Sequence, residues 1–365
     1  MITVLSSASA RPNFVKLAAV HHALSKHEDI RHIIVHTGQH YDPMLSDIFF
    51  TQLSIPQPDL NLGVKGGDRE QVIDTTMIAM EKAIEKFKPD IVLVYGDVNG
   101  AVGAARAARN KGIRLGHVEA GLRSFDEAMP EELNRIEIDQ LADELFVSEQ
   151  SGLDNLAAEG MKGRVHFVGN TMIDTLIRMR PLIDQQELPI SSVRRGERFA
   201  VATLHRPSNV DHERALEECF SLLRGVGESM PVLLPIHPRL QSSLQTFGYM
   251  SQPARMKGIH QKDPMPYLQF LRLVSESSLV LTDSGGIQEE AVLMKKRCFT
   301  LRRNTERPST IDSGSNVLIN PEKEADRKKV LEFAKNPVVP QITVPELWDG
   351  KAGERISKIL TTILQ

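Results

Sequence analysis

Short, uninterrupted apolar runs recur along the chain and alternate with amphipathic segments. DIVLVYG (90–96) and DELFVSE (143–149) are examples from the first half, and FAVATLH (199–205) and SLVLTDSGG (278–286) from the second. Because apolar and polar residues do not alternate within them, these runs predict strands buried on both faces of a parallel sheet. Residues 69–87, between two such runs, carry apolar residues at helical spacing. Repeated strand–helix alternation predicts an α/β protein built from doubly wound sheets.

The alternation pauses between residues 171 and 197, where the sequence is polar, contains two prolines and ends in a basic cluster. We interpret this segment as the end of a helix followed by a linker. The chain of 365 residues is long enough for two domains. We therefore expect Rossmann-like domains at 1–170 and 198–345 that face each other across a central cleft, followed by a C-terminal helix within 346–365.

Composition excludes several classes of partner. The formal charge of −3 gives no strong attraction to nucleic acid or to an anionic membrane. Cys219 and Cys298 resemble buried thiols of a reducing compartment rather than a disulfide framework. No apolar stretch is long enough to span a bilayer, and the N-terminus lacks the pattern of a signal peptide. The sequence thus predicts a cytoplasmic protein without nucleic-acid or membrane partners.

Signatures of metals and of common nucleotide cofactors are missing. Neither H-E-x-x-H nor C-x-x-C occurs, so no metal site is expected. The chain also lacks G-x-G-x-x-G and G-x-x-x-x-G-K-[ST], which argues against a tightly bound dinucleotide and a P-loop. We therefore expect no metal and no cofactor.

Doubly wound sheets bind ligands at the carboxyl ends of their strands, and unusual residues of the first half lie there. Arg11 and Lys16 follow the first strand at a helix start, which favours anion binding, although two solvated cations on a loop are the alternative. Asp97 follows the strand that ends in Tyr95; it is either functional or the N-cap of the next helix.

The stretch HVEAGLRSFDEAMPEELNR (117–135) concentrates acids and bases at the end of another strand. A carboxylate there, Glu119, pays for lost hydration unless something uses or pairs it. It is therefore an acid–base candidate whose pKa burial would raise. Glu131 and Glu132 begin a helix after Pro130, where the helix macrodipole is a sufficient structural reason for them.

In the second half, Ser284, Gly285 and Gly286 link a strand to a helix, where backbone N–H groups can hold a phosphate. The rival interpretation, a nucleophilic serine, lacks the G-x-S-x-G pattern. Glu290, one turn further, could hold a ribose diol. His205 and His237 each end a strand; a lone histidine is usually structural, but a pair at equivalent points favours a functional role.

These residues lie in motifs that together resemble one family. ARPNFVK, TGQH, YGD, HVEAGLRS, PEELNR, VGNTMID, LHR, IHP, DSGGIQEEA and LRRNTERP follow one another in the order typical of non-hydrolysing UDP-N-acetylglucosamine 2-epimerases, over about residues 1–360. The resemblance implies the two-domain GT-B fold of one large class of glycosyltransferases, with the C-terminal helix packed on the N-terminal domain. It also implies an isomerase without a redox cofactor, and we expect a homodimer.

The implied reaction interconverts UDP-N-acetylglucosamine and UDP-N-acetylmannosamine for surface polysaccharide biosynthesis. UDP is eliminated to leave a glycal and then adds back, with a proton on the other face of C2. By resemblance, the carboxylates beside the sugar are Asp97, Glu119 and Glu131. The groups that stabilise the departing diphosphate are Arg11, Lys16, Arg135 and His205.

The resemblance also assigns the nucleotide contacts. Ser284, Gly285 and Gly286 would bind phosphate, and Glu290 the ribose. The Met265 backbone and the Phe270 ring would frame uracil. The expected substrate-binding residues further include His237.

The chain departs from the family pattern at several positions. Ser9 replaces a glycine, Asn13 a glutamate and Val98 a threonine. Many bacterial members have a second, allosteric UDP-sugar site, in which Asp42 replaces a glutamine here. The other residues of that site persist as Gln39, Arg69, Arg206 and His237. A carboxylate near a diphosphate is unfavourable, so we expect no such activation.

Other functions stay open on the sequence alone. The variants around GQHYDP and VYGD are similar to relatives that act on UDP-2,3-diacetamido uronic acids. A hydrolysing epimerase, a UDP-sugar glycosyltransferase and a non-catalytic UDP-sugar sensor are the remaining alternatives. The full set of acids argues against a sensor, because a protein that only binds a diphosphate gains nothing from nearby carboxylates.

Overall fold

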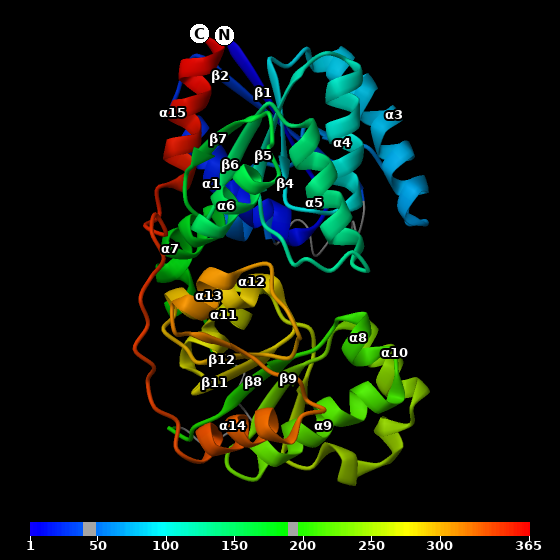
Figure 1. Ribbon diagram of the computed structural model, residues 1–365, viewed down its shortest axis with the longest axis vertical. Coiled ribbons are helices and arrows are strands. Elements are labelled where there is room, and N and C mark those ends of the chain that lie inside the picture. Colours follow the sequence, from blue (N-terminus) through cyan, green and yellow to red (C-terminus); the bar gives the residue numbers. More distant parts are fainter. Residues whose placement is uncertain (39–48, 189–195) are drawn as a thin grey trace. The chain divides into compact units, whose positions relative to one another are not determined.

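The computed structural model describes residues 1–38, 49–188 and 196–365. The chain forms two compact units. Unit 1 consists of Met1–Met179 and Pro345–Gln365, and unit 2 of Arg180–Val344. Each unit has its own parallel sheet with helices against it (Figure 1).

The sheet of unit 1 has the strand order β3-β2-β1-β4-β5-β6-β7, and every pairing is parallel. Its strands are β1 (Ile2–Ala8), β2 (Ile30–His36), β3 (Leu60–Asn61), β4 (Ile91–Tyr95), β5 (Arg114–Ala120), β6 (Glu144–Val147) and β7 (Arg164–Phe167). The chain winds from β1 first to one side and then to the other. The switch point, where such sheets bind ligands, is therefore between β1 and β4.

Helices cover both faces of this sheet. They are α1 (Arg11–Leu24), α3 (Arg69–Phe87), α4 (Asn99–Asn110), α5 (Pro130–Leu141), α6 (Gln150–Ala158), α7 (Thr171–Asp184) and α15 (Ala352–Leu364). Helices α3, α4 and α5 pack side by side on one face, whereas α1 and α15 pack together on the other (Figure 1). The helix predicted at 69–87 is confirmed as α3, which begins at an Asp68–Gln71 capping box.

Unit 2 repeats the design with the strand order β10-β9-β8-β11-β12-β13, again all parallel. Its strands are β8 (Ala200–Thr203), β9 (Val232–Pro235), β10 (Ile259–Lys262), β11 (Leu279–Thr282), β12 (Cys298–Thr300) and β13 (Asn316–Leu318). Its helices are α8 (Pro207–Val210), α9 (Glu213–Gly227), α10 (Pro238–Thr246), α11 (Tyr267–Glu276), α12 (Gly285–Leu293), α13 (Pro308–Asp312) and α14 (Glu324–Lys335), with 3₁₀ turns at Tyr249–Ser251 and Pro253–Met256. The switch point lies between β8 and β11.

The predicted pair of doubly wound sheets is confirmed, because the central apolar runs are strands buried on both faces. All five residues of β4 are buried, for example. Cys219 and Cys298 are buried free thiols. Residues 171–184, placed by the sequence at a helix end and linker, form α7 with Pro181 inside it, and the boundary between the units falls after Met179.

Candidate active site

Two carboxylates lie at the carboxyl ends of the neighbouring strands β4 and β5, beside the switch point of unit 1. Asp97 comes after Gly96, which closes β4 with a left-handed φ of 66°. Glu119 has a φ of 75°, and the register between β5 and β6 shifts from Val118 to Ala120 around it. Such a bulge turns a side chain out of the normal alternation of a strand. The local backbone thus directs both acids to the ligand-binding edge of the sheet.

Glu119 is paired, as a buried carboxylate must be. The Lys16 ammonium on α1 forms an ion pair with it, and the two side chains are only 7% and 8% exposed. Gly96 lies directly beside this pair, since a Cβ atom there would stand 2.9 Å from Lys16 Nζ and 3.6 Å from Glu119 Oε2. The positive φ of Gly96 favours glycine at this position, where the chain passes close to the ion pair.

Asp97 has a cationic partner on α5. Arg135 Nη2 lies 2.5 Å from Asp97 Oδ2, and Arg135 Nη1 lies 2.6 Å from Glu132 Oε2. The Glu132 carboxylate also accepts hydrogen bonds from the backbone N–H groups of Ser124 and Phe125. Glu132 therefore fixes the loop before α5, a role that its place in the first turn did not reveal. Glu131, beside it, is half-buried.

The start of α1 is tied to the end of β4. Asn13 Oδ1 accepts from the backbone N–H groups of Ser9 and Ala10, and Asn13 Nδ2 donates to the Tyr95 carbonyl at 2.8 Å. Asn13, which replaces the glutamate usual in the family, thus links the start of α1 to the end of β4. Arg11 is exposed at the first residue of α1. Lys16, Asp97, Glu119 and Arg135 come together at this edge of unit 1.

The sequence did not reveal a cluster of three buried charged or polar side chains behind these acids. They are His117, Asp139 and Arg123, and both His117 and Arg123 pair with Asp139. His117 lies within a strand and Asp139 within a helix, where a core residue and a solvated face are the usual interpretations. Only their pairing in three dimensions identifies them.

Many family members have a second UDP-sugar site, as noted above. Two of its positions, Gln39 and Asp42, lie outside the described residues. Arg69 is described: its guanidinium donates to Asn134 Oδ1 at 2.7 Å, and Asn134 Nδ2 donates to the Asp97 carbonyl at 2.8 Å. Arg69 is therefore linked to the loop of Asp97 through one amide side chain.

In unit 2, a buried aspartate that the sequence analysis overlooked organises the ends of β8 and β11. Asp283 accepts hydrogen bonds from the backbone N–H groups of His205 and Arg206, and His205 Nδ1 lies 2.8 Å from its Oδ1. Burial alone would raise the pKa of Asp283, but the His205 ring and these N–H groups outweigh it and lower the pKa. The His237 ring lies 5.4 Å from that of His205. The two predicted histidines are therefore neighbours.

Ser284 is the N-cap residue of α12, which begins with Gly285 and Gly286. A Cβ at Gly285 would collide with the side chains of Arg307 and Glu306, which form a buried ion pair. The glycine thus lets the start of α12 approach this pair. Free N–H groups at a helix start suit a phosphate, as the sequence predicts.

Glu290 lies within α12 and is buried. Burial raises its pKa to about 8, although the Tyr267 hydroxyl, which donates to Glu290 Oε1 at 2.6 Å, favours the ionised form. Tyr267 begins α11, Met265 precedes that helix and Phe270 lies on it, both half-buried. The residues predicted to meet uracil and ribose thus come from α11 and α12 of the same unit.

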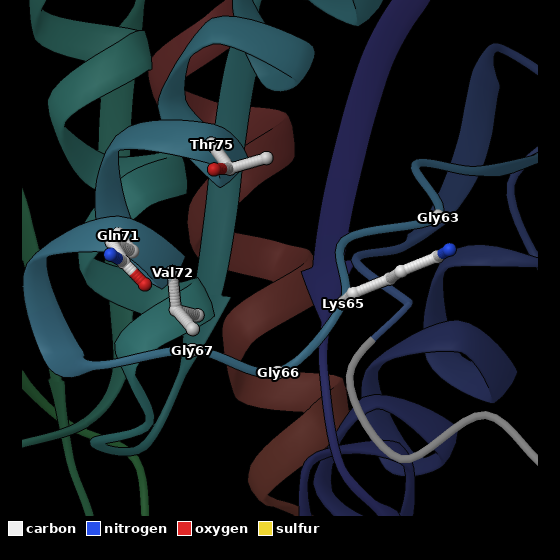
Figure 2. A pocket seen from close by; sticks show the side chains of 7 residues that line it. All are labelled: Gly63, Lys65, Gly66, Gly67, Gln71, Val72 and Thr75. Carbon is white, nitrogen blue, oxygen red and sulfur yellow. The ribbon is translucent and has the colours of Figure 1, made fainter.

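A pocket separate from these residues lies in unit 1 before and along the first turns of α3 (Figure 2). Its volume is about 400 Å³, and it is lined by Gly63, Lys65, Gly66, Gly67, Gln71, Val72 and Thr75. Figure 2 shows the Lys65 side chain extending away from Gln71 and Val72. None of the predicted site residues lines this pocket.

Within residues 1–38, 49–188 and 196–365, no cluster of three or more histidine, cysteine or acidic side chains suited to a metal ion occurs. Among the helices of the same ranges, none has the length and apolar character needed to cross a bilayer.

Two doubly wound parallel-sheet units with charged residues at their strand ends define an α/β protein of the GT-B fold class. A trehalose 6-phosphate synthase from Burkholderia multivorans shares this fold, with a TM-score of 0.60 at 12% identity over 100% of this chain and 96% of that one. The chain belongs to the UDP-N-acetylglucosamine 2-epimerase family, whose model matches residues 22–361.

Two relatives are similar over nearly their full length. The crystal structure of Methanocaldococcus jannaschii UDP-GlcNAc 2-epimerase in complex with UDP-GlcNAc and UDP has a TM-score of 0.89 and 35% identity, covering 99% of this chain and 100% of that one. The UDP-2,3-diacetamido-2,3-dideoxy-D-glucuronate 2-epimerase of Pseudomonas aeruginosa is 36% identical over 366 residues, 99% of each chain. The family resemblance read from the motifs is confirmed.

Proposed function

We propose that this protein interconverts UDP-N-acetylglucosamine and UDP-N-acetylmannosamine by elimination and re-addition of UDP. The observation that carries the proposal is the set of paired charges at the switch point of unit 1. Two carboxylates, Asp97 and Glu119, each have a cationic partner there. Family membership over residues 22–361 supports the same reaction.

The chemistry requires these types of residue. The C2 proton of the sugar is not next to a carbonyl group, so direct removal is too costly. A carboxylate instead takes the proton while the C1–O bond breaks, and the C2–H electrons form the C1=C2 bond of a glycal. UDP leaves with the electrons of the C1–O bond. It then adds back to C1 while an acid returns a proton to the other face of C2.

Each unit supplies part of this chemistry in the proposal. From unit 1, Asp97, Glu119 and Glu131 would transfer protons. The cations that would stabilise the charge of the leaving diphosphate are Arg11, Lys16, Arg135 and His205. For the nucleotide, unit 2 would supply Ser284, Gly285, Gly286 and His237 for phosphate, Glu290 for ribose, and Met265 and Phe270 for uracil.

One alternative substrate has a specific observation in its favour. The Pseudomonas aeruginosa relative, 36% identical, is named for a UDP-2,3-diacetamido uronic acid. The same elimination applies to that sugar, because its C1–C2 bond carries the same groups. A hydrolysing epimerase or a glycosyltransferase would differ in what attacks C1, namely water or an acceptor hydroxyl.

One experiment separates these possibilities. The protein is incubated in D₂O with UDP-N-acetylglucosamine and, in parallel, with the 2,3-diacetamido uronic acid analogue. We expect deuterium at C2 and both UDP-linked epimers from the first substrate. Free N-acetylmannosamine would indicate hydrolysis, and turnover of the uronic acid alone would move the proposal to that substrate. If neither substrate exchanges its C2 proton for deuterium, the proposal that this protein is an epimerase is rejected.

We also propose that the enzyme acts in the cytoplasm as a homodimer and supplies surface polysaccharide biosynthesis. The charge, the cysteine usage and the family resemblance support this setting. Light scattering coupled to size-exclusion chromatography measures the oligomeric state directly, and a monomer at micromolar concentration would contradict the dimer.

A further inference from the structure

Asp139 on α5 is buried; it contacts the segment around Glu119 directly and the loop before Asp97 through His117. Its Oδ1 lies 2.6 Å from His117 Nδ1, and its Oδ2 accepts from the backbone N–H of Gly121 at 3.1 Å. Arg123 Nη1 lies 2.8 Å from the same Oδ2. On the far side of the imidazole, His117 Nε2 lies 3.0 Å from the Gly96 carbonyl oxygen.

The two ring nitrogens of His117 have different partners. The Gly96 carbonyl can only accept, so Nε2 carries a proton. Burial opposes ionisation of Asp139, but His117 and Arg123 outweigh it and lower the pKa of this carboxyl. His117 Nδ1, on the other side of the ring, lies within hydrogen-bond distance of Asp139 Oδ1. His117 thus links Asp139 to the Gly96 carbonyl through its two ring nitrogens.

These bonds end at the two places where the backbone is unusual. Gly96, whose carbonyl accepts from His117, has a φ of 66° and directly precedes Asp97. Glu119 has a φ of 75°, rare for a residue with a side chain. His117 and Gly121 lie two residues before and after Glu119, and both bond to Asp139. A strained backbone persists only where its surroundings determine it, and Asp139 supplies that constraint on both sides.

We propose that Asp139 and His117 are positioning residues that hold Asp97 and Glu119 in the arrangement needed for proton transfer. The inference rests on the proposed epimerase function. Neither residue touches substrate; each acts through the backbone that presents the catalytic carboxylates.

A purely structural role is the alternative, and the cluster itself provides the control. Glu159 pairs with the outer side of Arg123 through two hydrogen bonds of 2.8 Å and 2.7 Å. It belongs to the same charge network but contacts neither Gly96 nor Gly121. Glu159→Gln therefore removes one carboxylate charge from the network and leaves both catalytic loops tied.

The test compares Asp139→Asn, His117→Gln and Glu159→Gln with the wild-type full-length protein. Steady-state kinetics with UDP-N-acetylglucosamine, circular dichroism and UDP calorimetry are measured for each. Misplacing reacting groups by an ångström costs on the order of 100-fold in rate, so we expect falls of about 10–100-fold in kcat for the first two variants. KM and UDP affinity should change little. Glu159→Gln should retain wild-type kcat.

His117→Gln also provides a graded readout. Its amide can still donate to the Gly96 carbonyl, whereas His117→Leu cannot. We therefore expect His117→Gln to retain more activity than His117→Leu at equal thermal stability. Equal activity of these two variants would show that the bond to Gly96 is unimportant.

The outcomes separate this inference from the function on which it rests. A wild-type protein that exchanges no C2 proton overturns the function and the inference together. An active wild type with normal kcat in folded Asp139→Asn and His117→Gln overturns only the positioning role. If these variants do not fold, NMR of wild-type His117 decides: a hydrogen bond at each ring nitrogen supports the positioning role, and a ring nitrogen without one contradicts it.

Discussion

Glu119 combines a buried carboxylate, a left-handed backbone and an ion pair with Lys16. The first two features are costly alone, because burial penalises the charge and the side chain opposes a positive φ, and the ion pair offsets the first cost. Together they place a carboxylate beside a cation at the edge of the sheet where ligands bind. That combination distinguishes Glu119 from an acid that merely caps a helix.

Replacement of Glu119 by glutamine should therefore affect chemistry more than binding. The amide keeps the size of the side chain but cannot take a proton. Loss of a general acid or base costs about 10²–10⁴-fold, so we expect a fall of that size in kcat and in C2 deuterium exchange. UDP affinity, measured by calorimetry, should stay unchanged.

A matched control for this variant lies on α5. Glu137 is a partly exposed carboxylate that pairs with Arg106 at 2.6 Å, and we give it no role in the reaction. Glu137→Gln should keep wild-type turnover. A Glu119→Gln enzyme that exchanges the C2 proton at the wild-type rate would make Glu119 structural.

Glu290 should link nucleotide binding to pH. Burial raises its pKa to about 8, so at neutral pH most of the ligand-free protein carries it protonated. A ribose diol held by the carboxylate favours the ionised form. We therefore expect UDP to bind more tightly as pH rises from about 6.5 to 8.5, with release of protons in calorimetry.

Glu290→Gln is the control for that experiment, because it retains a similar shape without a titrating group. The pH dependence that remains in this variant belongs to UDP and to other residues. The truncation Glu290→Ala should weaken UDP binding by about 1–3 kcal/mol. Equal pH profiles for wild type and Glu290→Gln would contradict the ribose assignment.

The sequence indicated which charged residues lie at strand ends but not which residues lie behind them. Glu119 stood out because a carboxylate at the end of a buried strand loses hydration unless something pairs or uses it, whereas Asp97 also had an explanation as a helix N-cap. Asp139 did not stand out, since an aspartate between polar residues of a helix is usually solvated. Its role depends on His117 and Gly121, which are distant in the chain, so no local pattern could reveal it.

At the scale of elements, a half-buried carboxyl on α7, Asp174, joins that helix to the start of α15. Asp174 Oδ2 on α7 accepts from the Gly353 N–H at the start of α15, at 2.8 Å. Burial raises the pKa of Asp174 to about 6, against its ordinary 3.8. One hydrogen bond of the C-terminal helix therefore involves a group that titrates in the mildly acidic range.

The sign of this effect follows from linkage. A carboxyl whose pKa is higher in the folded state stabilises that state below its unfolded pKa, and this contribution is lost as pH rises through about 6. Asp174→Asn keeps an acceptor for Gly353 but cannot ionise. Relative to this variant, wild type should lose on the order of 2–3 kcal/mol of unfolding free energy between about pH 4 and pH 7. Urea unfolding at several pH values measures the difference, and a pH-independent difference would refute it.

Element prediction succeeded for the buried centre of each sheet and failed at one edge of each. Strands β4 and β11 were evident as apolar runs, and α3 was found with its bounds. The edge strands β3 and β10 were missed, because Leu60–Asn61 is too short and Ile259–Lys262 is mostly polar. Edge strands bury one side at most, so their sequences carry little of the periodic signal.

At the scale of the whole molecule, unit 1 is assembled from two distant parts of the chain. Pro345–Gln365 belongs to it although unit 2 intervenes. Trp348, the one tryptophan of the sequence, is 2% exposed and donates from Nε1 to the Ser148 carbonyl at 3.0 Å. Gly353 approaches α1 so closely that a Cβ would stand 2.3 Å from the Ala19 carbonyl oxygen.

Gly353→Val should therefore loosen the C-terminal segment from unit 1. We expect a lower Tm, a shift of Trp348 emission to longer wavelength and faster amide exchange in α1. Gly66→Val is the control, because a Cβ there meets no atom within 4 Å. If Gly353→Val kept the wild-type emission and Tm, α1 and α15 would accommodate the added side chain without loss of stability, and the prediction would be wrong.

The two-part construction of unit 1 also bears on the order in which the protein matures during translation. Domains usually fold in the order in which the ribosome releases them. Here residues 180–344 emerge before α15, so unit 2 has all its strands while the first 179 residues still lack a helix that covers α1. Unit 1 therefore cannot complete its fold until unit 2 has been synthesised. Until then, part of α1 stays uncovered. We expect ribosome-bound chains stalled before residue 352 to bind chaperones through this half, and completion of the last helix to release them.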